Sequence, residues 1–346
     1  MFPEQNMSFE DVEQSQEYNL FGFDELDSEL QSIEPEGYYE SQPSLDNNPA
    51  NSGAVVERIN NHKLTKNELR FIRACDLVAR DSANEAKSIA YYPPYLSKTT
   101  LPMVSTSEPV FERENGHLKL TMIGHPDWGL PYGKVARRLL VHLVTYSILH
   151  KTPVVPVVSM RQLSRDLNIP IRGKGHELIH NMLMRLFHAT MFVMAKDDKT
   201  SEQIEVNRCA ILDSVCITKD EGKQRCIVLD HKFYELCESS AAPIDLRVVN
   251  ALQSPIEFDI YVFLLARLLT VKNIIRIPWA DFIRQFGSSN KNQASAKQRL
   301  KKAIDKVMVI QPQMNVQYTD EFVILKPSMS AIKTRSGAYR LAGITS

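Results

Sequence analysis

Two histidines and a glutamate near the middle of the chain have the spacing of a zinc-peptidase motif. His176-Glu177-Leu178-Ile179-His180 fits the pattern H-E-x-x-H, in which two histidines one helical turn apart bind the metal and the glutamate activates water. Such a site needs a third ligand, and the nearest downstream carboxylates, Glu202 and Glu205, fall in an expected loop or strand. Gly173-Lys174-Gly175 also places the motif on the first turn of its helix, outside an apolar interior. Zinc-dependent hydrolysis therefore stays open only as an alternative.

Two other groups of residues have ligand-binding types at spacings that fit no common site. Residues 129–134 (Gly-Leu-Pro-Tyr-Gly-Lys) resemble a phosphate loop, but one residue is missing between the glycines and Val135 stands where serine or threonine is needed. Cys226, His231 and Cys237 could bind zinc by residue type, but their spacing matches no common zinc site. None of the five cysteines forms a Cys-x-x-Cys pair. We expect reduced, mostly buried thiols, no metal site and no cofactor.

Side chains that suit DNA binding gather in residues 291–306. When residues 293–309 are placed on a helix at about 100° per residue, five apolar residues share one inward face. These are Ala296, Leu300, Ala303, Ile304 and Val307. The predicted DNA contacts lie opposite this face or beside it: Lys291, Ser295, Gln298, Arg299, Lys301, Lys302 and Lys306. Asp305 lies on the same outer side of the helix and is not a predicted contact. Gln298 could pair with adenine through two hydrogen bonds, and the lysines could reach guanine edges or phosphates.

A second and less basic helix is expected over residues 175–188. Its predicted inward residues are Leu178, Ile179, Met182, Leu183 and Leu186. Further DNA contacts are predicted in the preceding turn and on the outer helix face, at Arg172, Lys174, Asn181, Arg185 and His188. Because this face mixes charged, polar and apolar groups, it could bind DNA with less specificity or serve partly in self-association.

The elements that hold these two helices follow the same order twice. The first copy comprises a helix over residues 134–149, a strand over 154–158, a helix opened by the capping box of residues 159–162, the helix over 175–188, a strand over 191–195 and a long hairpin over 203–230. The second comprises a helix over 256–270 opened by the capping box of residues 254–257, a strand over 274–277, helices over 278–286 and 293–309, and strands over 313–317 and 322–326. At an offset of 119 residues, Leu163 falls on Phe282 and Leu167 on Phe286.

Helix, strand, helix, turn, helix and hairpin is the order of a winged helix-turn-helix, whose second motif helix enters the DNA major groove. Its double occurrence predicts an α+β chain with two tandem winged helix-turn-helix domains. The predicted domains are residues 58–240, which make DNA contacts and could form a dimer interface, and residues 241–330, the main DNA reader. A disordered acidic arm over 1–57 precedes them, and a flexible basic tail over 331–346 follows. An additional helix over 64–83 carries the core stripe Leu69, Ile72, Leu77 and Val78.

The net charge of zero hides two opposite parts. Residues 1–57 contain fourteen acidic residues and neither lysine nor arginine, which leaves 27 acidic against 41 basic residues and a charge of +14 for the rest. A basic body with helical DNA-binding patterning points to nucleic acid. The longest apolar run, residues 260–269 interrupted by Arg267, is too short to span a bilayer, and we expect a cytoplasmic, non-enzymatic protein.

The acidic arm contains a short segment that could dock on a partner. Residues 16–21, with Gln16, Leu20 and Phe21 as the predicted partner-binding side chains, resemble the glutamine-to-Leu-Phe peptides that bind the bacterial sliding clamp, with one residue more than the common pentapeptide. The arm's negative charge could also cover the basic DNA face and suppress non-specific binding. The sequence leaves both hypotheses open.

Five separate blocks resemble the plasmid-encoded RepA family of replication initiators. They are residues 129–140 (GLPYGKVARRLL), 254–261 (SPIEFDIY), 277–281 (IPWAD), 297–309 and 325–328 (LKPS), and the resemblance covers roughly residues 125–330. The resemblance implies an initiator that binds repeated sites at a plasmid origin, helps to open the duplex and recruits host replication proteins, the host initiator and helicase among them. It also implies a C-terminal winged helix as the main sequence reader, an N-terminal one as the dimer interface, and repression of its own gene by the dimer. Residues 174–188 depart from the family, whose members are richer in arginine there. A transcriptional repressor without initiator activity remains the alternative.

Overall fold

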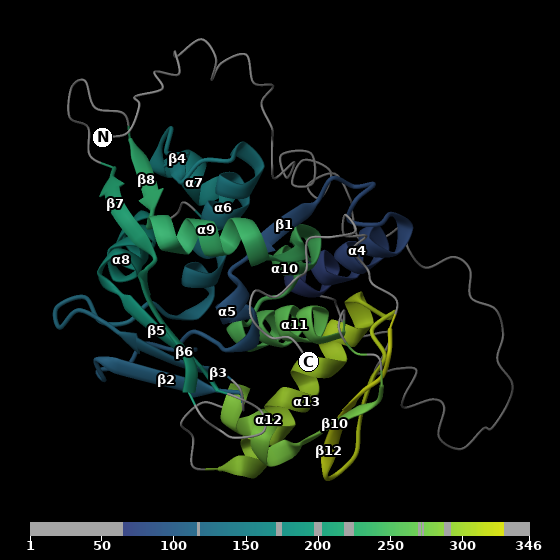
Figure 1. The fold of residues 1–346 in the computed structure, drawn as a ribbon. Helices are drawn as coiled ribbons and strands as arrows, with labels where there is room; N and C mark the ends of the chain where they lie inside the picture. Colours follow the sequence, from purple (N-terminus) through teal and green to yellow (C-terminus); the bar gives the residue numbers. More distant parts are fainter. Residues whose placement is uncertain are drawn as a thin grey trace, which may run out of the picture. The chain divides into compact units, whose positions relative to one another are not determined.

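The same succession of six elements occurs twice between residues 133 and 325 (Figure 1). The first copy consists of α6 (Gly133–His150), β4 (Val154–Pro156), α7 (Met160–Asp166), α8 (Gly175–His188), β7 (Leu212–Cys216) and β8 (Cys226–Leu229). The second consists of α11 (Pro255–Leu268), β10 (Ile275–Pro278), α12 (Trp279–Phe286), α13 (Gln293–Ile310), β11 (Val316–Tyr318) and β12 (Phe322–Leu325). The computed structural model describes residues 65–115, 118–170, 175–196, 203–217, 225–268, 271, 273–286 and 292–328. The described residues from Asn67 onward belong to one compact unit.

Each copy closes with a three-stranded antiparallel sheet of the same topology. The strand orders are β4-β8-β7 and β10-β12-β11, so in both copies the last strand lies between the other two. Residues that match at the offset of 119 are buried in both copies: Leu163 and Phe282 are buried, and so are Leu167 and Phe286. The fold is therefore mixed α+β, and its internal repeat is one of topology.

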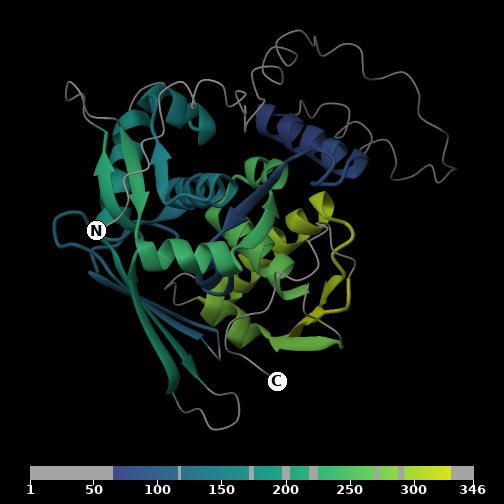
Figure 2. The ribbon, with the colours of Figure 1, turned by 45° about the horizontal axis from the view of Figure 1, so that its top comes forward.

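A hairpin inserted into the first copy builds a separate sheet. Between α8 and β7 the chain forms β5 (Thr190–Lys196) and β6 (Gln203–Ala210), which join β2 (Val110–Glu114) and β3 (Leu118–Ile123) in the order β2-β3-β5-β6 (Figure 2). The predicted hairpin over residues 203–230 is confirmed for β7 and β8, which pair with each other, and wrong for residues 203–210, because β6 pairs with β5. Alternation of apolar residues shows that a segment is a strand but not which strand lies beside it.

Each of the two predicted capping boxes forms one of its two reciprocal hydrogen bonds. Ser159 Oγ accepts a hydrogen bond from the backbone N–H of Gln162 at 3.0 Å, while the Gln162 side chain donates to Asp166 at 2.7 Å and not to the start of the helix. At the start of α11, Glu257 Oε2 accepts from the backbone N–H of Ser254 at 3.2 Å. Each helix still begins within one residue of the start that the sequence predicted.

α4 (Lys66–Arg80) lies on the unit with less burial than its sequence predicts. Leu69 and Ile72 are 44% and 52% exposed, and Leu77 and Val78 are only half-buried. The predicted core stripe is therefore wrong for Leu69 and Ile72. A stripe of apolar residues fixes which face of a helix turns inward, but not how deep the helix sits.

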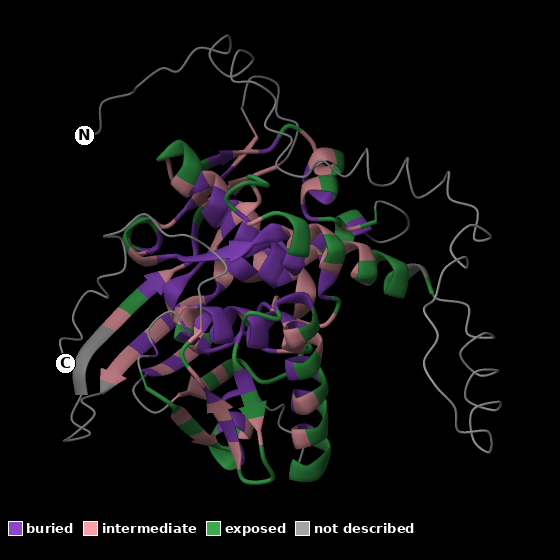
Figure 3. Ribbon diagram, turned by 90° about the vertical axis from the view of Figure 1, so that its right-hand side faces the viewer, coloured by how far each residue is buried: buried purple, intermediate pink, exposed green. Residues whose placement is uncertain are grey.

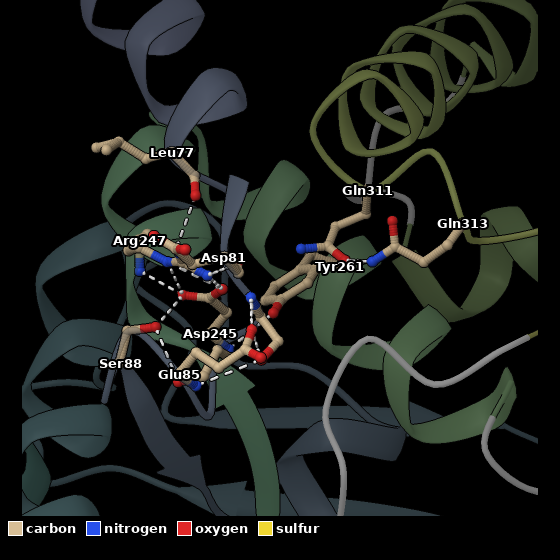
Figure 4. Close-up of polar contacts among 11 residues, drawn as sticks. Leu77, Asp81, Glu85, Ser88, Asp245, Arg247, Tyr261, Gln311 and Gln313 are labelled. Atoms are coloured by element: carbon tan, nitrogen blue, oxygen red, sulfur yellow. Dashed lines mark hydrogen bonds and ion pairs between the residues drawn. The ribbon is translucent and has the colours of Figure 1, made fainter. Parts of the chain in front are cut away.

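Polar contacts hold the C-terminal end of α4 in place (Figure 4). Arg247 donates to the backbone oxygens of Leu77 at 2.8 Å and Asp81 at 3.0 Å, so its cation lies where helix carbonyls end unpaired. The carboxylate of Asp245 orients the guanidinium at 2.8 Å and accepts from Ser88 Oγ at 2.9 Å. The contact therefore joins α4 to residues more than 160 positions away in the sequence.

Elements on both sides of the predicted domain boundary at residue 240 pair with each other. β1 (Ile89–Tyr92) forms an antiparallel ribbon with β9 (Ala242–Asp245). The remaining elements of the unit are α5 (Pro94–Lys98), α9 (His231–Ser240) and α10 (Leu246–Ala251). The division into residues 58–240 and 241–330 stays a prediction, and these contacts show that the two parts share an extensive junction.

The core lies along α6 and α11, the first helices of the two copies. Ten of the 18 residues of α6 and nine of the 14 residues of α11 are buried, so both helices are enclosed on most sides. In Figure 3 the buried residues gather along the central elements, and exposed residues follow the outer faces. Within the described residues, no helix combines the length and apolarity needed to cross a membrane.

A fully buried ion pair joins these two helices. The Arg137 guanidinium donates to both carboxylate oxygens of Asp259, at 2.7 and 2.6 Å, and both side chains are at most 2% exposed. Its remaining N–H groups donate to the backbone oxygens of Leu101 at 2.8 Å, Pro102 at 3.2 Å and Gly133 at 2.8 Å. All five donors of the guanidinium are thereby satisfied, which is the condition under which a buried charge is tolerated.

We predict that Asp259→Asn destabilises the fold by about 3–5 kcal/mol, because it leaves a buried arginine without its counter-charge. The free energy of unfolding in urea measures the effect. The matched control is Asp76→Asn in the exposed pair Asp76–Arg80, whose closest approach is 2.6 Å, and it should cost less than about 1 kcal/mol. Equal losses in the two variants would show that the buried pair does not hold the copies together.

The His142 side chain of α6 generates a prediction on acid stability. Burial lowers its pKa to about 4, so the folded protein keeps the ring neutral while the unfolded chain binds a proton below about pH 6.5. The stability that depends on the neutral ring is therefore complete above about pH 6.5 and is lost as the pH falls toward 4.

In the variant His142→Gln, the decrease in unfolding free energy between pH 7 and 4.5 should be about 2 kcal/mol smaller than in the parent. Urea unfolding at several pH values measures it. His231→Gln, in an exposed residue of α9, is the control and should keep the parent's pH dependence. An unchanged pH dependence in His142→Gln would contradict the assignment.

Candidate nucleic-acid interface

The helix α13 forms where the sequence predicts it and with the predicted inward face. Asn292 caps it by accepting a hydrogen bond from the backbone N–H of Ser295 at 3.1 Å. The five residues predicted to pack inward are all buried, at 3% exposure or less: Ala296, Leu300, Ala303, Ile304 and Val307. This prediction is confirmed, because apolar residues three and four apart leave a single way to orient the helix.

The opposite face of α13 is open to solvent. Its exposed polar residues are Ser295, Gln298, Arg299, Lys302 and Asp305. They lie three or four positions apart, so they form one continuous strip along the helix. We call these five residues the α13 face. Lys291, the remaining predicted contact on this side, lies outside the described residues.

One flank of α13 is attached to the β11–β12 hairpin. Lys297 Nζ donates to the backbone oxygen of Asp320 at 2.6 Å, and Lys301 Nζ lies 3.7 Å from the Asp320 carboxylate. Both ammonium groups lie over the Trp279 ring, at 5.4 and 5.8 Å from its centroid. The Tyr318 hydroxyl of the hairpin donates to Asp305 at 2.9 Å. The predicted DNA contact Lys301 thus has intramolecular partners, and sequence reasoning missed the structural role of Lys297.

Lys306, on the other flank, belongs to a polar junction with α11 and α4. Its ammonium lies 3.1 Å from both carboxylate oxygens of Glu257 and over the Phe71 ring of α4, at 5.1 Å from the centroid. Burial and, to a smaller extent, the charges of Arg138 and Lys306 lower the pKa of nearby Lys134 to about 8, against the opposing effect of Glu257. The spacing that predicted a DNA contact at Lys306 did not indicate this ion pair.

The C-terminal half of the outer face of α8 is partly covered, in contrast to the α13 face. Arg185 donates to the Asn181 side chain at 2.7 Å and to the backbone oxygen of Leu130 at 3.0 Å, and it lies over the Tyr132 ring. Gly129 makes this close approach possible, because a Cβ there would lie 3.0 Å from Arg185 Nη1 and its φ of +75° suits glycine. Both side chains are half-buried, and Arg185 is engaged by Leu130 and Tyr132, so the DNA contacts predicted at Asn181 and Arg185 stay a prediction.

His188 of α8 is covered by the same segment. Its ring stacks on Trp128 with centroids 6.0 Å apart and lies 4.8 Å from the His125 ring, so it too is half-buried. Leu178 is also a correction, because it was predicted to pack inward and is 39% exposed. The remaining predicted inward residues of α8, Ile179, Met182, Leu183 and Leu186, are buried. Arg172 and Lys174 lie outside the described residues.

The H-E-x-x-H segment occupies the first turns of α8. His176, Glu177 and His180 are exposed, and the nearest aromatic neighbour of His180 is Trp128, with ring centroids 6.3 Å apart. In the part of the chain that the structure describes, no three His, Cys, Asp or Glu side chains lie close enough to hold a metal ion.

Comparison with known proteins gives distant structural matches only. No family model matches the sequence, and no curated protein matches it. A crystal structure of selenomethionine derivatives of domains 2 and 3 of RctB matches at a TM-score of 0.42 and 9% identity, over 68% of this chain and 99% of that one. A second structure of RctB domains 2–3 matches at a TM-score of 0.42 and 10% identity, over 67% and 96%. A likeness at this level assigns neither a family nor a function.

Proposed function

We propose that this chain is a plasmid replication initiator of the RepA type, which binds repeated origin sites through two winged-helix domains. The proposed protein opens the adjacent duplex, recruits host replication proteins and, as a dimer, represses its own gene. It is not an enzyme and carries no resident cofactor. The observation that carries the proposal is the α13 face, which is exposed, polar and cationic on the helix that this order of elements assigns to the major groove.

The chemistry of the α13 face suits a major groove. Gln298 can donate to and accept from the edge of adenine, and Lys302 can reach a guanine edge or a phosphate. Ser295 near the start of the helix adds a short donor and acceptor close to the backbone N–H groups that favour phosphate. The hairpin β11–β12 is fixed beside the helix by Trp279 and Tyr318, so helix and hairpin would meet DNA as one rigid surface.

The contrast between the two copies supports the second as the main DNA reader. In the first copy Arg185 and His188 are engaged by residues 125–132, whereas Gln298 and Lys302 of the second extend from an exposed helix face. A helix whose outer residues are already bonded must break those bonds to read bases. We therefore propose that the first copy contributes positioning contacts and self-association.

We predict different effects for the two exposed residues of α13. Lys302→Ala should weaken binding to all sequences alike and reduce the slope of log affinity against log salt by about 0.9, the value of one phosphate contact. Gln298→Ala should instead lose about 1–3 kcal/mol of preference for the repeat over unrelated DNA. Fluorescence anisotropy with repeat and scrambled duplexes at several salt concentrations measures both.

Lys232→Ala is the matched control, because it removes an exposed lysine from α9, outside the repeated elements. It should bind like the parent. If Lys302→Ala and Gln298→Ala also bind repeat DNA like the parent, α13 does not read DNA.

Initiation is distinguished from repression by a replication assay. A plasmid whose only origin is the DNA flanking this gene should be maintained in a host that supplies the protein, and it should be lost when Lys302→Ala and Gln298→Ala are combined. A reporter driven by the gene's own promoter is measured in the same cells. Repression of the reporter without plasmid maintenance would favour the alternative, a transcriptional repressor.

A further inference from the structure

Cys216 and Cys226 lie directly opposite each other at one end of the β7–β8 ladder. The antiparallel register pairs Cys216 with Cys226, followed by Val215 with Ile227. Directly opposed residues of an antiparallel pair have Cα atoms about 4.5–5.5 Å apart and side chains on the same face of the sheet. A disulfide requires Cα atoms about 4.4–6.8 Å apart, so the register itself meets the geometric condition.

The two thiols are free and reachable. Both cysteines are reduced in the structure, and both are half-buried and not enclosed. Burial raises the pKa of Cys226, and the proximity of Cys216 raises it further, which is the electrostatic sign of two sulfurs that lie close together. The pair is therefore both juxtaposed and accessible to a small reagent.

A second pair of cysteines provides an internal contrast. Cys209 on β6 and Cys237 on α9 are 7% and 1% exposed, and each thiol lies in the protein core. Burial raises the pKa of Cys209 to about 11 and raises that of Cys237 as well, with Cys209 contributing to the latter. Such thiols stay protonated and shielded, and a thiol that is not ionised is a poor nucleophile.

We propose that Cys216 and Cys226 form a redox-active dithiol, which small disulfides of the glutathione class oxidise to a disulfide bond across β7 and β8. The thiolate of one cysteine attacks oxidised glutathione, forms a mixed disulfide and releases one glutathione thiolate. The second cysteine attacks the protein sulfur of the mixed disulfide, forms the Cys216–Cys226 bond and releases the second glutathione. Two electrons pass to glutathione, and the two protons of the cysteines end on its two thiols.

The bond would fix one end of an irregular ladder. The register of β7 and β8 shifts between Leu212 and Ser214, so the two strands are not held in a single uninterrupted alignment. A covalent link at Cys216 pins the other end. β8 is also the central strand of its sheet, with β4 on its far side, so the constraint reaches the whole three-stranded sheet of the first copy.

Peptide mapping of the full-length protein tests the proposal. The protein is equilibrated with oxidised and reduced glutathione, quenched with acid, alkylated and digested with trypsin. Cleavage after Arg208, Lys219, Arg225, Lys232 and Arg247 gives peptides 209–219, 226–232 and 233–247. We expect 209–219 linked to 226–232 in more than about half of the molecules at equal concentrations of the two forms, with Cys209 and Cys237 alkylated.

Three variants make the outcome unambiguous. Cys209→Ser should keep the link. In this variant Cys216 is the only cysteine of peptide 209–219, so a link from this peptide must involve Cys216. Cys216→Ser and Cys226→Ser should each abolish it and leave glutathione on the remaining cysteine. The proposal is overturned if Cys216 and Cys226 stay alkylated in the oxidised parent, if peptide 209–219 is linked to 233–247 instead, or if the link forms only after unfolding in urea.

Discussion

Arg137 and Asp259 form an ion pair in the interior of the unit. The hydrogen bonds of this pair restrict how α6 and α11, the helices that carry it, can move against each other. Every N–H of the guanidinium has a partner, so a small shift of α6 against α11 would leave a buried donor unsatisfied. These are equivalent helices of the two copies, and each is buried along most of its length. A hydrophobic interface would tolerate several packings of two such apolar helices, whereas the bidentate pair accepts one. The pair thus fixes the orientation of the two copies, even though a buried ion pair adds little net stability.

With the copies fixed, the difference between α8 and α13 follows from what lies beside each helix. Residues 124–133, which lead into α6, fold back over α8 and are held there by Arg185, Gly129 and the stacking of Trp128 on His188. In the part of the second copy that the structure describes, the hairpin β11–β12 contacts one flank of α13 through Asp320 and Tyr318 and leaves the outer face exposed. The same topology therefore presents one helix whose C-terminal half is partly covered and one helix whose outer face is open.

Much of the fold follows from local sequence, and the errors occur where long-range pairing decides. The bounds of α8, α12 and α13 and the inward face of α13 were predictable, because caps and apolar spacing act within a few residues. The partner of β6 was not, because apolar alternation does not choose between two neighbouring strands. The shallow burial of Leu69 and the ion pair of Lys306 with Glu257, 49 positions away, were not either. Arg137 and Asp259 lie in two of the five blocks singled out in the sequence, residues 129–140 and 254–261, yet periodicity gives no reason for a charge on an apolar face. Such a charge indicates a partner, but the partner is known only once the helices are placed.

In the proposed complex with DNA, the basic residues of α13 are limited by the partners they already have within the protein. A lysine that is already paired with a carboxylate brings little uncompensated charge to a phosphate, and it must first leave its partner. Lys306 faces Glu257, and Lys297 and Lys301 face Asp320 and the Trp279 ring, so three of the cations of this helix are engaged within the protein. Lys302 lies on the exposed α13 face. In the proposed complex with DNA, counterion release from α13 should therefore correspond to fewer charges than its basic composition suggests. In the proposed complex, specificity would then come chiefly from polar groups such as Gln298, whose hydrogen bonds to base edges are insensitive to salt.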